Sequence, residues 1–289
     1  MKPVLRPVLQ WLSTGLLSLI AITVLAAPAA EERVACPLSA EVVAVVDRLV
    51  SAEATTGYRG TLLLEYGIDR EFIAVDVDQA TGLARLQHLN RAGGQTKELG
   101  LGVAALRTGC DLARYYRFQL EPGRVVAGRA TQRLRVAPKD TLRLGYMMDL
   151  DAETGLPLRV VTAHPEGQVL ERYEFADIKL WTSSVTPHRA PIISTAAGGL
   201  GFRGLPPGFV LVRQSEEPIG HVVVSDGLSV ASVYVEPKPP ALPTGEGVVW
   251  RGASLTYTRG RGDGALVTVL GEVPLSTARL LAEAIGQRR

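Results

Sequence analysis

A run of alternating apolar residues constrains this chain most, because it fixes a strand pair of which one face must be covered. Apolar side chains recur at every second position from Leu142 to Leu150 and again from Leu156 to Val160. The intervening segment Asp151–Gly155 is rich in turn-forming residues. A period of two indicates β-strands with one apolar face. The sequence therefore predicts an antiparallel hairpin that needs a second layer of structure.

A helix near the start of the chain can provide that second layer. Between Ser39 and Ala54 the apolar residues follow the helical spacing i, i+3, i+4, i+7, i+8, and Gly57 ends the pattern. Further strand-like runs flank the hairpin, at Thr61–Tyr66, Phe72–Val77, Leu83–Leu89, Val125–Val136 and Val169–Phe175. We therefore predict an α+β fold in which residues 36–180 form a curved antiparallel sheet that encloses a helix.

A second, smaller α+β domain is predicted for residues 205–289. A cluster of glycines, Gly198, Gly199, Gly201 and Gly204, marks a linker at 181–204. Strand-like runs follow at Phe209–Arg213, His221–Val224, Ser229–Val235, Val248–Thr258 and Ala265–Leu270. A closing helix is expected from Pro274, because proline suits a first helical turn and an apolar stripe follows it.

The first 29 residues match a signal peptide. Lys2 and Arg6 precede Trp11–Leu25, an uncharged run of roughly 15 residues, and small residues suited to cleavage follow. An uncleaved anchor is the alternative, although a membrane span needs about 20 apolar residues. We therefore expect a periplasmic protein. Without Lys2 and Arg6, 29 of the 31 basic residues remain against 29 acidic ones, and this neutral balance argues against a nucleic-acid binder.

Export changes what the two cysteines predict. Cys36 and Cys110 would meet in an oxidising compartment, where two thiols commonly pair. A disulfide between positions 74 residues apart would contribute about 4 kcal/mol by the chain-entropy estimate. Two unpaired thiols are the alternative. The chain has no C-x-x-C motif, so redox catalysis is not expected.

Short segments of the sequence match parts of catalytic or cofactor-binding motifs, but their neighbouring residues do not fit these motifs. The segment Gly199–Gly204 has the letters G-x-G-x-x-G, but Pro206 and Pro207 follow it and cannot continue the helix that would hold a phosphate. Gly227-Leu228-Ser229 begins like a nucleophile elbow, but it fits a turn better. The four histidines do not have metal-ligand spacing. We predict no cofactor, no metal and no enzymatic activity.

Short motifs in both halves of the chain resemble one known family. In the N-terminal half they are Val125–Arg129, Pro138, Asp140, Arg143, Gly145–Tyr146 and Asp151–Leu156. In the C-terminal half they are Pro207–Phe209, Val224–Leu228, Ser232–Glu236, Gly271–Pro274 and Thr277. Taken in this order, they resemble the RseB/MucB family of periplasmic regulators of the envelope-stress sigma factor.

The resemblance implies an N-terminal domain similar to the lipoprotein carriers LolA and LolB, an open β-barrel that encloses helices, and a smaller C-terminal domain. It also implies a non-catalytic regulator that binds the periplasmic part of an RseA/MucA-type anti-sigma factor and shields it from proteolysis. Lipids or lipopolysaccharide would release that grip. From the densest motif we take Ser225, Asp226, Leu228 and Tyr234 as candidate partner-binding residues, with a merely structural role as the alternative.

Two rival functions stay open at this point. A periplasmic lipid or lipoprotein carrier would use the N-terminal sheet alone, because its apolar face suits acyl chains, although an ordinary filled core explains that face as well. A simple carrier would not need residues 205–289. A secreted hydrolase with a dispersed site is the third hypothesis, and it would need one of the histidines as its base. A homodimer is neither required nor excluded by the sequence.

Overall fold

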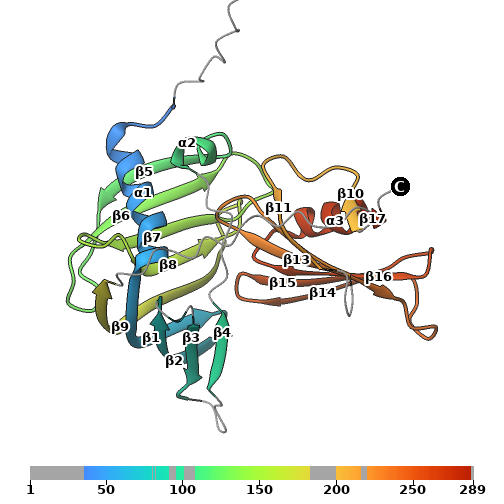
Figure 1. Cartoon of the computed structure of the whole chain (residues 1–289), viewed down its shortest axis with the longest axis horizontal. Coiled ribbons are helices and arrows are strands. Elements are labelled where there is room, and N and C mark those ends of the chain that lie inside the picture. The colour runs from blue at the N-terminus through green and yellow to red at the C-terminus, as the bar shows by residue number, and fades with distance from the viewer. Residues whose placement is uncertain are drawn as a thin grey trace, which may run out of the picture. The chain divides into compact units, whose positions relative to one another are not determined.

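Antiparallel sheets make up most of the protein, as the computed structural model shows (Figure 1). The described residues are 36–79, 81, 83–90, 96–100, 108–182, 200–215 and 220–287. The predicted signal peptide, residues 1–29, and most of the predicted linker lie outside them. No helix in these described segments is long and apolar enough to cross a membrane.

The first sheet has nine strands and is open, with an edge strand at each end. Its strands in sheet order are β4 (Lys97–Gly100), β3 (Leu83–His88), β2 (Asp69–Asp78), β1 (Thr56–Tyr66), β9 (Val169–Thr182), β8 (Pro157–Ala163), β7 (Gly145–Asp151), β6 (Thr131–Pro138) and β5 (Tyr116–Pro122). All pairs are antiparallel. The strands β1 and β9, which are the first and the last of this sheet along the chain, pair with each other. The predicted antiparallel hairpin is confirmed as β7 and β8, which join at Leu150 and Pro157.

The helix predicted from the apolar stripe is confirmed as α1 (Ala40–Thr55). The Ser39 hydroxyl caps it by accepting a hydrogen bond from the Val42 backbone N–H at 3.3 Å. Its apolar face packs in one buried cluster with residues of β6 and β7, and Figure 1 shows α1 crossing the face of these strands. The buried members from α1 are Val45, Val46 and Leu49. A short helix, α2 (Gly109–Leu112), adds Leu112 to this cluster.

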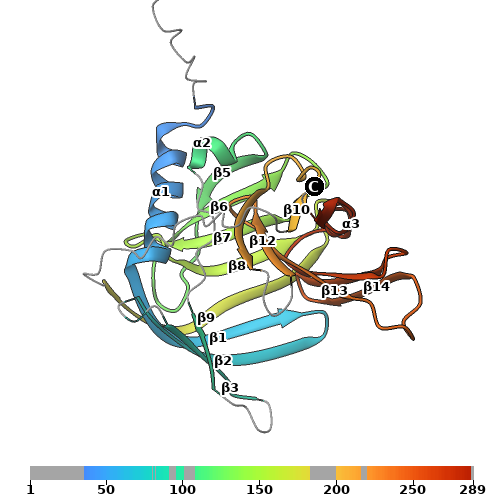
Figure 2. The ribbon, with the colours of Figure 1, turned by 45° about the vertical axis from the view of Figure 1, so that its right-hand side comes forward.

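The second sheet has six strands, with one face covered by a helix. In sheet order its strands are β11 (Val210–Ser215), β12 (Gly220–Ser225), β13 (Val230–Pro237), β16 (Ala265–Gly271), β15 (Ser254–Gly260) and β14 (Gly245–Arg251). The predicted closing helix is confirmed as α3 (Leu275–Ala284), which buries its apolar stripe against the inward residues of β12, β13, β15 and β16 (Figure 2). A separate antiparallel pair is formed by β10 (Leu200–Phe202) and β17 (Ile285–Gln287), the strand that directly follows α3.

Two predicted strands were wrong in extent. Val125–Val136 is a strand only from Thr131, because Ala127 and Gly128 have φ values of +48° and +76° and form a tight turn. Val248–Thr258 is not one strand but a hairpin of β14 and β15, which reverses at Gly252 with φ +60°. The division into domains at 36–180 and 205–289 stays a prediction.

Candidate functional site

The turn between β12 and β13 presents a buried carboxylate to the first sheet. Both sheets belong to one compact unit that begins at Cys36. Inside the turn, Oδ1 of Asp226 accepts hydrogen bonds from the backbone N–H groups of Leu228 and Ser229, at 2.9 and 2.8 Å. The Ser225 hydroxyl donates to the Ser229 carbonyl at 2.8 Å and accepts from the Gly227 N–H at 2.9 Å. Oδ2 of Asp226 is therefore left for contacts outside the turn.

Residues of the first sheet occupy that second oxygen. The Tyr116 hydroxyl donates to Oδ2 of Asp226 at 2.7 Å, and Nε of Arg143 lies 3.1 Å from the same atom. The side chains of Arg143 and Asp226 are both fully buried. Arg143 also pairs with Asp140 and donates to the Pro207 carbonyl. A buried charge is tolerated only when it is paired and hydrogen-bonded, and this arrangement meets that condition for both partners.

Aromatic rings cover the faces of the Arg143 guanidinium. Its Cζ lies 4.4 Å from the ring centroid of Tyr115 and 5.4 Å from that of Phe209, so cation–π contacts add to the ion pair. Arg143 was not among the predicted site residues, although it belongs to the motifs that resemble the family. Its position between Leu142 and Leu144 in an apolar alternation is typical of a solvent-facing strand residue.

The region where the two sheets meet around Arg143 and Asp226 is called the junction below. A second group of hydroxyl contacts lies in it along β7. The Tyr146 hydroxyl and the Ser229 hydroxyl are 2.8 Å apart, and both side chains are buried. Burial raises the pKa of Tyr146, and the nearby charge of Glu272 raises it further, so the phenol stays protonated. Burial likewise raises the pKa of Tyr116, and the Asp226 charge adds to it. At the start of α3, the Thr277 hydroxyl donates to the Leu142 carbonyl at 2.6 Å.

The end of β14 makes a separate contact with β2. Glu71 is only 2% exposed, and one of its oxygens lies 2.8 Å from Nη2 of Arg251. Its other oxygen lies 3.0 Å from Nδ1 of His88. Nε of Arg251 donates to the Tyr66 hydroxyl at 3.1 Å. A cation from the second sheet thus neutralises a buried carboxylate of the first.

Two further carboxylates lie at the junction. Oε2 of Glu171, on β9, accepts a hydrogen bond from the Ala253 backbone N–H at 2.8 Å. Burial raises the pKa of Glu272, at the end of β16, and the charge of Glu171 raises it further. The two sheets are therefore held by paired charges at two places, and a pair of mutually repelling carboxylates lies elsewhere, with Glu171 on β9 and Glu272 just after β16.

The predicted partner-binding residues do not form one surface. Ser225 and Asp226 are fully buried in the turn just described, and Leu228 packs against the cluster under α1. Tyr234 lies apart from them, on β13, with its ring stacked on His221 at 4.4 Å between centroids. Their role in partner binding stays a prediction. The first three make contacts within the chain at the junction of the two sheets.

The structure joins Cys36 and Cys110 by a disulfide, with 5.1 Å between their Cα atoms. The bond ties the chain just before α1 to α2. Gly109 packs closely there, because a Cβ at this position would lie 3.4 Å from Val46. Leu112 at the end of α2 and Tyr116 at the start of β5 belong to the buried cluster, and the Tyr116 hydroxyl contacts Asp226.

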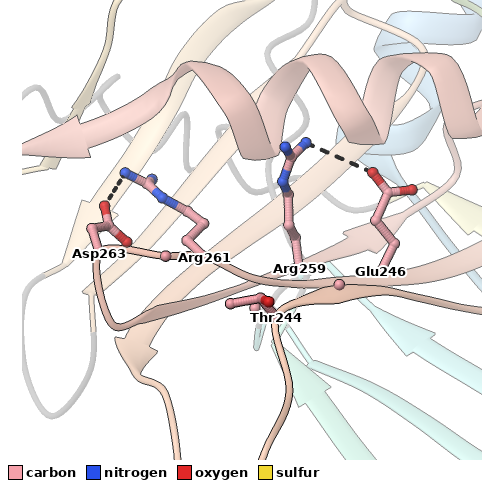
Figure 3. Close-up of a pocket in the computed structure, with 8 residues that line it drawn as sticks. Thr244, Glu246, Arg259, Arg261 and Asp263 are labelled. Atoms are coloured by element: carbon pink, nitrogen blue, oxygen red, sulfur yellow. Dashed lines mark hydrogen bonds and ion pairs between the residues drawn. The ribbon is translucent and has the colours of Figure 1, made fainter.

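A polar hollow of about 620 Å³ lies at the other end of β14 and β15 (Figure 3). Arg259 lies 2.7 Å from Glu283 and 3.7 Å from Glu246, and Arg261 pairs with Asp263. Since both arginines have carboxylate partners, the hollow is not a ready-made anion site. It is lined by Thr244, Gly245, Glu246, Arg259, Gly260, Arg261, Gly262 and Asp263.

Among the described residues, no three His, Cys, Asp or Glu side chains gather in a metal-binding arrangement. The groups with the largest shifts in pKa at the junction are tyrosines held in their protonated form. Their partners are structural: a turn carboxylate and a turn hydroxyl. The fold and the junction define a class of protein built from two antiparallel sheets, in which buried ion pairs join one sheet to the other.

Comparison with known families makes this class specific. Residues 88–192 match the MucB/RseB N-terminal domain, and residues 195–286 match the MucB/RseB C-terminal domain. The two matches follow each other in the order of the two sheets. The chain belongs to the MucB/RseB family.

Two characterised relatives illustrate the extent of the likeness. The sigma factor AlgU regulatory protein MucB of Pseudomonas aeruginosa is 28% identical over 284 residues, which cover 83% of this chain and 89% of that protein. The sigma-E factor regulatory protein RseB of Escherichia coli K12 is 29% identical over 195 residues, 60% of each protein.

Solved structures agree with the sequence relatives. MucB in complex with MucA(peri) has a TM-score of 0.64 and 26% identity, and it covers 86% of this chain and 99% of the solved one. MucB alone has a TM-score of 0.64 and 28% identity over 86% of this chain and 98% of the solved one. The likeness therefore spans both sheets.

Proposed function

We propose that this protein is a non-catalytic regulator that binds the exported part of an RseA/MucA-type anti-sigma factor and shields it from proteolysis. One observation carries the proposal: a relative that covers 86% of this chain was solved in complex with MucA(peri). The ion pairs Arg143–Asp226 and Arg251–Glu71 support the proposal, because they join the two sheets and leave these buried charges without a catalytic role. A stable two-part scaffold is what occlusion of a peptide requires.

The same proposal includes location and architecture. The charged start and apolar run of residues 1–29 support export to the periplasm, and the Cys36–Cys110 disulfide fits an oxidising compartment. We take residues 36–180 as a LolA/LolB-like domain, 181–204 as its linker and 205–289 as the smaller domain. Ser225, Asp226 and Leu228 would then affect partner binding by fixing the junction, and Tyr234 would act from its own place on β13.

The test measures binding and protection together. The purified exported segment of the host's anti-sigma factor is titrated with this protein by calorimetry, and is then exposed to the site-1 protease with and without it. We expect association at micromolar concentrations or tighter, and slower cleavage. Tyr234→Ala should weaken binding and lower stability only by the loss of its stack on His221, whereas Asp226→Asn should lower both more strongly. Absence of association at these concentrations would overturn the proposal.

One observation favours a lipid ligand as a second, compatible role. A cluster on one face of β1, β2 and β3 contains the buried Ile73, Val75, Val77 and Ala84, with Tyr58, Leu62, Leu64 and Leu86 only partly buried against it. Such partly covered apolar surface suits an acyl chain of a lipid or a lipopolysaccharide. Native mass spectrometry of the purified protein should show a co-purifying lipid. If lipid is found while the anti-sigma segment does not bind, the carrier function is the better explanation.

A further inference from the structure

The edge strand β14 is exposed along its whole length. All seven of its residues, Gly245–Arg251, are solvent-exposed, although β14 belongs to a six-stranded sheet and lies at its margin (Figure 2). Three consecutive apolar side chains stand on it, with exposed fractions of 37% for Val248, 67% for Val249 and 44% for Trp250. A long apolar edge of this kind is a site at which another strand can add.

The hairpin turn fixes which backbone groups of β14 are free. Arg251 faces Ser254 across a two-residue turn, in which Gly252 has φ +60° and Ala253 does not have a positive φ, as in a type II′ turn. The residues that flank such a turn hydrogen-bond to each other, and the pattern alternates along the strand. Arg251 and Val249 therefore point their N–H and C=O groups at β15. Those of Trp250, Val248 and Glu246 point outward.

The other sheet edges in the described part of the chain are protected. The edge strand β4 has only four residues, and β11 has a register shift between Leu211 and Arg213. The edge strand β5 carries Arg117 and Glu121 and ends in Pro122. Short length, bulges, charges and proline are the devices that prevent strand addition. The register of β14 with β15 is continuous over all seven pairs, and its outward positions contain neither lysine nor proline; their one charge, Glu246, is paired with Arg279.

The position of β14 indicates what kind of chain would add to it. Its last residue, Arg251, is fixed to Glu71 of the first sheet. Gly252 packs against Tyr66, since a Cβ at this glycine would lie 3.2 Å from the Tyr66 Cβ. Two residues further along the β1–β2 turn, Ile68 is fully exposed. An extended chain that follows β14 toward Arg251 therefore arrives at the turn of the first sheet and can contact both sheets.

We propose that an extended segment of the anti-sigma factor's exported part adds to β14 as a seventh strand of the second sheet. The inference rests on the proposed function and specifies where that partner binds. Main-chain groups of Glu246, Val248 and Trp250 supply the pairing, and side chains that alternate on the added strand meet Val248 and Trp250 on one face and Val249 on the other. A second copy of the protein is the competing occupant.

A proline substitution tests the backbone pairing directly. Val248→Pro removes an outward N–H and leaves the hydrogen bonds to β15 in place, and edge strands tolerate proline at such positions. Val248→Ala is the matched control, because it shortens the side chain and keeps the N–H. We expect Val248→Pro to raise the Kd for the purified anti-sigma segment by about tenfold or more, and Val248→Ala by about threefold or less. Equal effects of the two substitutions would overturn the inference.

Hydrogen exchange on the unmodified protein gives an independent measurement. Amides of Val249 and Arg251 should already exchange slowly in the free protein, and those of Glu246, Val248 and Trp250 should become slow only when the anti-sigma segment binds. Binding that leaves these three amides unchanged would overturn the inference and leave the proposed function intact. A failure to bind would overturn both. A loss of self-association in Val248→Pro, with partner affinity unchanged, would assign β14 to a second copy instead.

Discussion

Removal of the positive charge of Arg143 should destabilise the protein more than any exposed ion pair would suggest. In Arg143→Met, the fully buried Asp226 carboxylate loses its cation but keeps the Tyr116 hydroxyl at 2.7 Å. Breaking a buried pair in this way costs about 3–5 kcal/mol of unfolding free energy. Asp226→Asn leaves Arg143 with Asp140, so its cost should be smaller, about 1.5–3 kcal/mol.

The double variant separates the ion pair from other effects. In Arg143→Met/Asp226→Asn neither buried charge is left alone, so we expect the loss to fall short of the two single losses added together by about 2 kcal/mol. The matched control is Arg59 and Asp76, which lie 2.6 Å apart on β1 and β2 with the Arg59 side chain 68% exposed. The interaction free energy between Arg59 and Asp76, measured by the same double-variant cycle, should be at most about 0.5–1 kcal/mol and should decrease in high salt.

The assay is urea unfolding at pH 7, followed by circular dichroism and by tryptophan fluorescence, without added salt and in about 0.5 M salt, roughly three times the physiological ionic strength. The buried pair should keep its coupling in salt because solvent ions do not reach it. A coupling between Arg143 and Asp226 as small as that of the control pair would refute the reasoning. It would mean that the junction does not depend on the buried charges.

Three further outcomes are expected. Cys36→Ser/Cys110→Ser should lower the unfolding free energy by about 4 kcal/mol, because the bond closes a loop of 74 residues; a change below about 1 kcal/mol in non-reducing buffer would contradict this. Burial and the Glu171 charge raise the pKa of Glu272, so the folded state holds its proton more tightly, and stability should fall as pH rises above 4.5. Glu272→Gln should remove that slope, and an unchanged slope in unfolding curves across pH 4.5–7 would refute it. Gly252→Ala should cost about 1–3 kcal/mol, because φ is +60° and its Cβ would lie 2.3 Å from Glu171; unchanged thermal unfolding would contradict this.

Local pattern in the sequence predicted the elements and the helix that packs on the first sheet, but not the contacts between the two sheets. The alternation from Leu142 to Val160 identified β7 and β8, and the stripe after Ser39 identified α1, because each records which side of an element is buried. The junction was not predictable in the same way. Tyr116 and Asp226 are 110 residues apart, and no local period relates them.

The buried charges were the hardest part to predict. Arg143 alternates with apolar neighbours, as a solvent-facing residue of a strand does, and only the second sheet makes its position an interior one. The same holds for Asp226, which the family motif indicated only as a candidate partner-binding residue. One of its oxygens does serve the turn, and the other joins the two sheets. The prediction of one strand over Val248–Thr258 was wrong because a two-residue turn, in which Gly252 has a positive φ, reverses the chain there.

The pairing of β1 with β9 has a consequence for the order in which the molecule can be completed. Thr56 lies opposite Thr182, so more than a hundred residues separate strands that end up hydrogen-bonded. A nascent chain emerges from its N-terminus, so the backbone groups of β1 that face β9 stay unpaired until β9 has been synthesised. Contacts so distant in sequence slow folding. This protein should therefore acquire its native structure late, and it should need protection from aggregation in the interval.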